Sequence, residues 1–152
     1  MGLVLAVLLA VSPAGTWNSA RTHLTLTYPH GWHVTTTSLT PITQPVQRIA
    51  VYSGGSPRPM GPPKAGQVIG IVMEQTNLAP GDLSRFPPRP DHFRVAHLGG
   101  VEGFNSGRSG RWGEIIFRDH GRGFYVFIGV GARAANQLAR LLGALDSLRV
   151  GS

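Results

Sequence analysis

Apolar and polar residues alternate along much of the chain between residues 22 and 130, a pattern that predicts β-strands. The clearest case is Thr22 to Tyr28, where Leu24, Leu26 and Tyr28 fall on one face and histidine and threonines on the other. Segments rich in glycine and proline separate the predicted strands. The same reasoning predicts strands at Trp32 to Thr37, Arg48 to Ser53, Phe93 to Leu98, Val101 to Phe104 and Arg111 to Arg118.

Two further segments, Gln67 to Gln75 and Gly123 to Val130, are apolar at successive positions rather than at alternate ones. A strand with two apolar faces must be covered on both sides. We therefore expect these two strands in the interior of the sheet.

The pattern changes after Gly131, where apolar residues recur at spacings of three and four. Leu138, Leu141, Leu142 and Leu145 form a stripe that predicts an amphipathic helix of about 15 residues lying on the sheet. Gly143 lies inside this helix, and we expect it where helix and sheet approach closely. The fold class predicted from the whole pattern is α+β: a largely antiparallel sheet of about six or seven strands with the C-terminal helix packed on it.

The N-terminal segment has a different character. Gly2 to Val11 is an unbroken apolar run of the length of a signal-peptide h-region, and Ala14 and Ala20 are two candidate cleavage points. No lysine or arginine precedes the run, so an uncleaved membrane anchor or a buried N-terminal strand or helix stays open. We assign residues 1–20 to a signal-peptide-like segment and residues 21–152 to a single domain. The expected location is secreted or extracytoplasmic, with membrane contact only through the N-terminal segment.

Composition narrows the class of protein. Apolar residues make up 41% of the chain and charged residues 14%, which suits one globular domain. Cysteine is absent, so disulfides, thiolate zinc sites and a cysteine-linked lipid anchor are excluded. The formal net charge is +7, which favours attraction to anionic material, although a compositional bias towards arginine produces the same excess.

No motif predicts catalysis, a cofactor or a metal. Gly129 to Ala134 matches G-x-G-x-x-A, but a dinucleotide site needs a further parallel strand, so we expect these glycines to turn a strand into the helix. The six histidines form no metal-binding motif, and Ser109 lies in Gly-Arg-Ser-Gly-Arg rather than in a nucleophile elbow. The sequence therefore favours a protein other than an enzyme and leaves an enzymatic activity open.

The candidate ligand-binding residues surround a predicted hairpin tip. Arg118, His120 and Arg122 lie there, with Arg108 and Arg111 shortly before them, and arginines gathered at one end of a sheet can bind phosphate or carboxylate groups. The alternative is a solvated tip in which Asp119 pairs with a neighbour. Specific nucleic-acid binding is not expected, because the aromatic residues lie mostly in apolar strands.

Two short motifs resemble the PsbP-like superfamily: Tyr28-Pro29-His30-Gly31-Trp32, and Leu145 to Val150 at the end of the helix. The resemblance implies an antiparallel sheet whose last strand leads into a C-terminal helix. It also implies an accessory role, since members include photosynthetic oxygen-evolution subunits, a nuclear import factor and bacterial envelope proteins. We expect a non-catalytic extracytoplasmic binding protein that engages an envelope protein or an anionic polymer. The alternative is a small envelope hydrolase or metal-dependent enzyme using histidines that the fold brings together.

Overall fold

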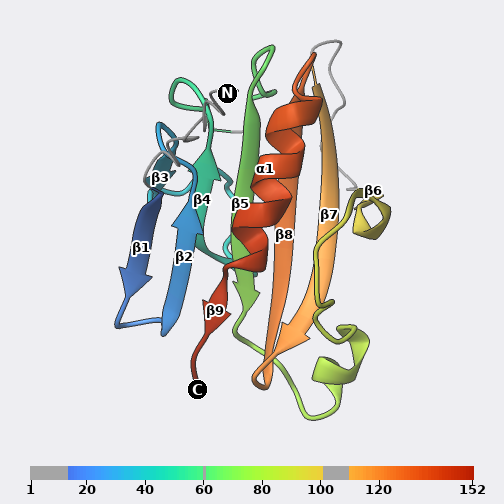
Figure 1. Cartoon of the computed structure of the whole chain (residues 1–152). Coiled ribbons are helices and arrows are strands. Elements are labelled where there is room, and N and C mark those ends of the chain that lie inside the picture. Colours follow the sequence, from blue (N-terminus) through green and yellow to red (C-terminus); the bar gives the residue numbers. More distant parts are fainter. Residues whose placement is uncertain (1–13, 60, 101–109) are drawn as a thin grey trace, which may run out of the picture.

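A computed structural model describes residues 14–59, 61–100 and 110–152 of the chain. The described part is an α+β fold, as the sequence pattern predicts (Figure 1). Two 3₁₀ turns, Asp82–Arg85 and Val95–His97, accompany the regular elements. In chain order these are β1 (Gly15–Ser19), β2 (Leu24–Tyr28), β3 (His33–Thr35), β4 (Val46–Tyr52), β5 (Val68–Gln75), β6 (Gly99–Gly100), β7 (Gly110–Asp119), β8 (Arg122–Gly131), α1 (Ala135–Asp146) and β9 (Arg149–Val150).

The described strands form two antiparallel sheets. The larger sheet has six strands in the order β3-β4-β5-β8-β7-β6, and the smaller has three in the order β1-β2-β9. The larger sheet has the expected number of strands. However, β2, which was predicted as part of one sheet, pairs with β1 and β9 in a second sheet that the alternation of residues did not predict. Figure 1 shows α1 lying along β5 and β8, with the small sheet beside it.

Strands β5 and β8 occupy the centre of the larger sheet, as their two apolar faces predict. Val72 and Val126 pack under α1, whereas Ile71 and Phe127 belong to a separate cluster on the opposite side. We call the side covered by α1 the helix face and the opposite side the far face. Both faces of these strands are buried because α1 covers one and loop residues such as Leu39 pack on the other.

Helix α1 packs closely on the sheet at Gly70 of β5. A Cβ atom placed on Gly70 would lie 2.9 Å from Cδ1 of Leu141, so the missing side chain makes room for the helix. The expectation that Gly143 fills this role is wrong, because Gly143 is exposed and no atom lies within 4 Å of its Cβ position. The close approach is thus achieved by a glycine of the strand.

The N-terminal boundary of the folded region also differs from the expected one. Gly15–Ser19, which we assigned from the sequence to the signal-peptide-like segment, forms β1 and pairs with β2 along its whole length. Residues 1–13 of that predicted segment lie outside the described residues. No helix in the described ranges has both the length and the apolar character needed to cross a membrane.

The segment predicted as a strand at Phe93 to Leu98 is instead a short 3₁₀ turn at Val95–His97. Phe93 is buried, but Val95 is 59% exposed, so the apolar alternation there does not correspond to a sheet face. The strand predicted at Val101 to Phe104 lies outside the described residues.

Candidate functional site

The predicted hairpin tip exists, but its two arginines point to different sides of the sheet. His120 and Gly121 form the turn between β7 and β8, both with positive φ, which suits a two-residue hairpin. Arg118 lies opposite Gly123 on the far face, where its guanidinium donates a hydrogen bond to the carbonyl oxygen of Phe86. Arg122 lies one position from Gly123 and therefore projects to the helix face.

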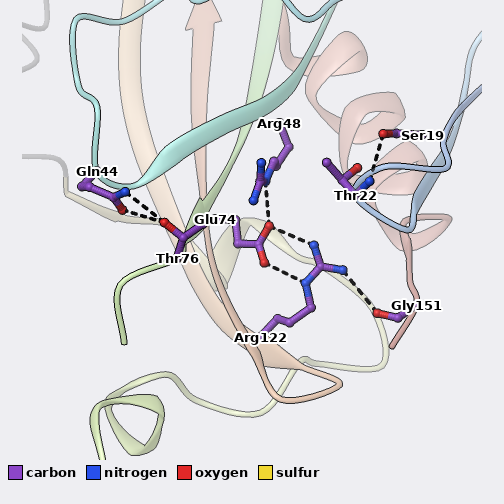
Figure 2. A network of polar contacts seen from close by, with 8 residues as sticks. All are labelled: Ser19, Thr22, Gln44, Arg48, Glu74, Thr76, Arg122 and Gly151. Carbon is purple, nitrogen blue, oxygen red and sulfur yellow. Dashed lines mark hydrogen bonds and ion pairs between the residues drawn. The ribbon is translucent and has the colours of Figure 1, made fainter. Parts of the chain in front are cut away.

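Arg122 is held in an ion-pair cluster on the helix face (Figure 2). Its Nε and Nη2 donate to the two carboxylate oxygens of Glu74 at 2.7 and 2.8 Å, and Arg48 Nε donates to the same carboxylate at 2.7 Å. Arg122 Nη1 also donates to the carbonyl oxygen of Gly151, at 3.2 Å, which joins the chain end beyond β9 to the larger sheet. The pairing is bidentate, the strongest geometry available to arginine and carboxylate.

Electrostatics explain why Glu74 remains ionised in this position. Burial alone would raise the pKa of Glu74, but hydrogen bonds and charge from Arg122 and Arg48 outweigh burial and lower it below its ordinary value of 4.5. Glu74 therefore neutralises one arginine of the pair and leaves the cluster with one net positive charge. The contacts of this cluster join β4 (through Arg48), β5, β8 and the C-terminal segment, so they are contacts within the fold.

Arg89, which the sequence pattern did not single out, closes the C-terminal end of α1. Its guanidinium donates to the carbonyl oxygens of Leu145 and Asp146, at 3.2 and 3.1 Å, and also to that of Leu148. These are groups that a helix end leaves without partners within the helix. Arg89 Nη1 also pairs with Asp119 at 2.9 Å, so the loop before β6, the hairpin tip and the helix end meet at one guanidinium.

The structure does not bring the other predicted ligand-binding residues together among the described side chains. His120 is more than half exposed and its Nδ1 lies 2.7 Å from Asp119. This contact matches the alternative in which Asp119 pairs with a neighbour at a solvated tip. Arg111 lies in β7, where only its backbone is described, and Arg108 lies outside the described residues. Within the described ranges, no three histidine, aspartate or glutamate side chains are grouped to hold a metal ion.

The G-x-G-x-x-A segment packs against the chain's own loop. A Cβ on Gly131 would collide with the carbonyl oxygen of Lys64, and the Gly131 amide donates to the carbonyl oxygen of Gln67 at 2.8 Å. The turn into α1 uses Arg133, with φ of 56°, rather than a glycine. The expected role of the glycines is therefore corrected: Gly131 permits close packing of the loop, and the left-handed residue of the turn is Arg133.

The far face carries a hollow among the described residues. Ile69 and Ile71 line it from β5, Leu39 comes from a covering loop, Trp112 from β7, and Arg58 from the loop between β4 and β5. Its empty volume is about 230 Å³, which includes solvent at its mouth. Most of this space is open solvent, and its enclosed part has room for about one water molecule, so the hollow is a shallow depression that is too small for a cofactor or a small-molecule ligand.

Apolar and ionisable side chains continue from the hollow along β7. Ile116 is 36% exposed and lies opposite Tyr125, whose ring packs edge-on against Phe86 at 5.2 Å between centroids. Glu114 lies between Trp112 and Ile116 on the same face. We call this surface, Trp112, Glu114, Ile116 and Tyr125 together with the hollow, the far-face patch.

Two groups of the far-face patch have displaced pKa values. Burial raises the pKa of Glu114 above its ordinary value of 4.5. The pKa of Tyr125 is raised by burial and by the negative charge of Glu114, against a smaller opposing effect of Arg85.

Sequence reasoning missed the far-face patch for a physical reason. Trp112 and Ile116 lie on a strand whose alternation predicts one buried face, and nothing local indicates that loops cover that face only in part. Tyr125 and Phe127 lie on the opposite face of β8 from Phe124, on the side away from α1. The aromatic residues of β8 on the side away from α1 are a sequence feature that could have indicated the patch.

Comparison with known proteins gives one likeness. The chain is similar to the solution structure of cyanobacterial PsbP (CyanoP) from Synechocystis sp. PCC 6803, with 9% sequence identity, a TM-score of 0.48 and 99% of each chain covered. No protein-family model and no curated protein matches the chain.

Proposed function

We propose that this chain is an exported, non-catalytic binding protein that docks an envelope protein through the far-face patch. The observation that carries the proposal is the hollow beside Trp112, with an apolar floor and Arg58 among its lining residues. Tryptophan, tyrosine and arginine are the residues that most often dominate protein–protein binding energy. The patch contains the first two, and arginines border it.

The contacts of the arginines favour a protein partner over a polyanion. Arg118 and Arg122 face opposite sides of the sheet and donate to Phe86 and Glu74 respectively. A polymer of repeated negative charge needs a continuous row of cations with free donors. The far-face patch is apolar at its centre. An apolar side chain of a partner protein can pack there, whereas a hydrated polyanion cannot.

The chemistry of the patch defines the partner segment. The hollow is shallow, so the partner side chain that covers it lies over the surface beside Trp112 and is apolar. Arg58 lines the hollow and Arg85 lies near Tyr125, with its side chain 81% exposed. With a net charge of +7 on the chain, the complementary segment carries carboxylates on either side of its apolar anchor.

The proposal is tested by site-specific photocrosslinking in cells that export the full chain. A photoreactive residue at Ile116 reports on the far-face patch, and one at Ala139, exposed on α1, is the matched control. We expect one discrete adduct from position 116 and none from position 139. Added wild-type protein should compete for this adduct, whereas the Trp112→Ala variant should compete at least about tenfold less well.

Three results would contradict the proposal. These are adducts of equal yield from both positions, equal competition by wild type and Trp112→Ala, and salt-sensitive binding to a teichoic-type polymer that Trp112→Ala leaves unchanged. Cell fractionation in the same experiment tests export separately from docking.

A further inference from the structure

Strand β1 is an integral part of the small sheet. All five of its residues, Gly15–Ser19, are in register with β2, from Gly15 opposite Tyr28 to Ser19 opposite Leu24. Trp17 is partly buried and packs against the core cluster beneath α1. A strand of this kind contributes both ladder hydrogen bonds and apolar contacts to the folded protein.

The start of β1 fits closely against its neighbour. A Cβ on Gly15 would overlap the aromatic ring of Tyr28, so the strand begins at a position where only a glycine fits without displacement. The turn after β1 is also ordered, because the amide of Thr22 donates to Ser19 Oγ at 3.2 Å. The folded structure therefore extends without a break from Gly15 into β2.

The two candidate cleavage points have different consequences for this structure. Hydrolysis after Ala20 would remove the whole of β1, with Trp17, and would leave the edge of β2 without its partner. Hydrolysis after Ala14 leaves every residue of β1 in place, because Ala14 precedes the strand and is exposed. Ser12 and Ala14 then occupy the positions three and one before the bond, where signal peptidases accept small residues.

We infer that the chain is processed at the Ala14–Gly15 peptide bond by a signal peptidase; this inference rests on the proposed export. Water adds across the bond, so that Ala14 gains a carboxylate and leaves with the leader, while Gly15 gains the new α-amino group. The mature protein begins with the first residue of β1. Its N-terminus then lies beside the Tyr28 ring, at the edge of the small sheet.

The experiment measures the intact mass and N-terminal sequence of the protein exported from cells that express the full chain. We expect a single product that begins at Gly15. The variant Ala14→Lys places a long charged side chain next to the bond and should reduce that product at least about tenfold. The matched control Ala20→Lys alters an exposed residue of the β1–β2 turn and should leave processing unchanged.

An extracytoplasmic product that begins at Arg21, or at any residue other than Gly15, overturns the inference while export stands. Loss of processing in Ala20→Lys but not in Ala14→Lys also overturns it. An unprocessed chain found only inside the cell contradicts export itself, and fractionation distinguishes this result from the other two.

Discussion

Arg118 and Arg122 lie only four residues apart across a two-residue turn, yet their guanidinium groups occupy opposite faces of the larger sheet. The cause is register: Arg118 is paired with Gly123 and Asp119 with Arg122, so the two arginines differ by one position in the strand alternation. One guanidinium donates to Phe86 and the other to Glu74. A small ligand bound to one face of the sheet therefore cannot contact both guanidinium groups.

Removing the carboxylate of Glu74 tests the importance of the cluster on the helix face. Glu74→Gln leaves Arg48 and Arg122 without their shared counter-charge, and we expect a loss of about 1–3 kcal/mol in the free energy of unfolding at pH 7. Urea denaturation measures this loss. Asp82→Asn is the control, since its contact with Arg85 is an exposed pair at 3.7 Å and should contribute less than about 0.5 kcal/mol.

The cluster also predicts a pH dependence of stability. The pKa of Glu74 is lowered in the folded state, so its contribution is complete above the unfolded value near 4.5 and is lost as pH falls through the folded pKa. The difference between wild type and Glu74→Gln should therefore shrink below pH 4.5. A difference of constant size down to pH 3 would show that the ion pair is not its source.

The pattern of apolar residues predicted the two central strands and the helix. Strands β5 and β8 were placed in the interior because Ile71 and Val72, like Phe127 and Ile128, are neighbours that point to different faces and are all apolar. The stripe of leucines predicted α1 and the face it buries. Both predictions rest on residues close together in the sequence: the helical spacing of the leucines, and apolar residues at successive strand positions that point to both faces.

The missed features depend on contacts between distant segments. Arg89 reaches residues 145–148 from a proline-rich loop, and no local spacing indicates such a contact. Strand β1 was missed because its residues closely follow the apolar run Gly2 to Val11 in the sequence. The far-face patch arises from loops that cover a strand surface in part, which is a property of tertiary packing rather than of the strand.

Arg89→Ala should destabilise the end of α1. The substitution removes donors from the carbonyl groups of Leu145, Asp146 and Leu148 and a positive charge from the negative end of the helix. We expect a loss of about 2–3 kcal/mol in the free energy of unfolding. Arg149→Ala is the control: Arg149 is exposed in β9, and its removal should cost less than about 0.5 kcal/mol. Equal losses in thermal denaturation would contradict the capping role.

Glu114→Gln should stabilise the protein at neutral pH. Burial raises the pKa of Glu114 in the folded state, so its ionisation opposes folding as pH rises from the unfolded value of 4.5 through the folded pKa. We expect wild type and variant to be equally stable near pH 4 and the variant to be more stable at pH 7, as measured by urea denaturation at both values. A variant that is less stable at pH 7 would show that the Glu114 carboxylate has a stabilising partner.

Two glycine-to-alanine substitutions should change stability in opposite directions. Gly143→Ala places a methyl group in open space within α1, where alanine is favoured, and should raise the free energy of unfolding by about 0.5–1 kcal/mol. Gly70→Ala places its methyl group 2.9 Å from Cδ1 of the buried Leu141 and should lower it by about 1–3 kcal/mol. Thermal denaturation of the two variants, each against wild type, measures both changes. The pair tests the packing of helix on sheet, because a helix that stood away from β5 would accept the methyl group at Gly70 without loss, while Gly143→Ala would still stabilise.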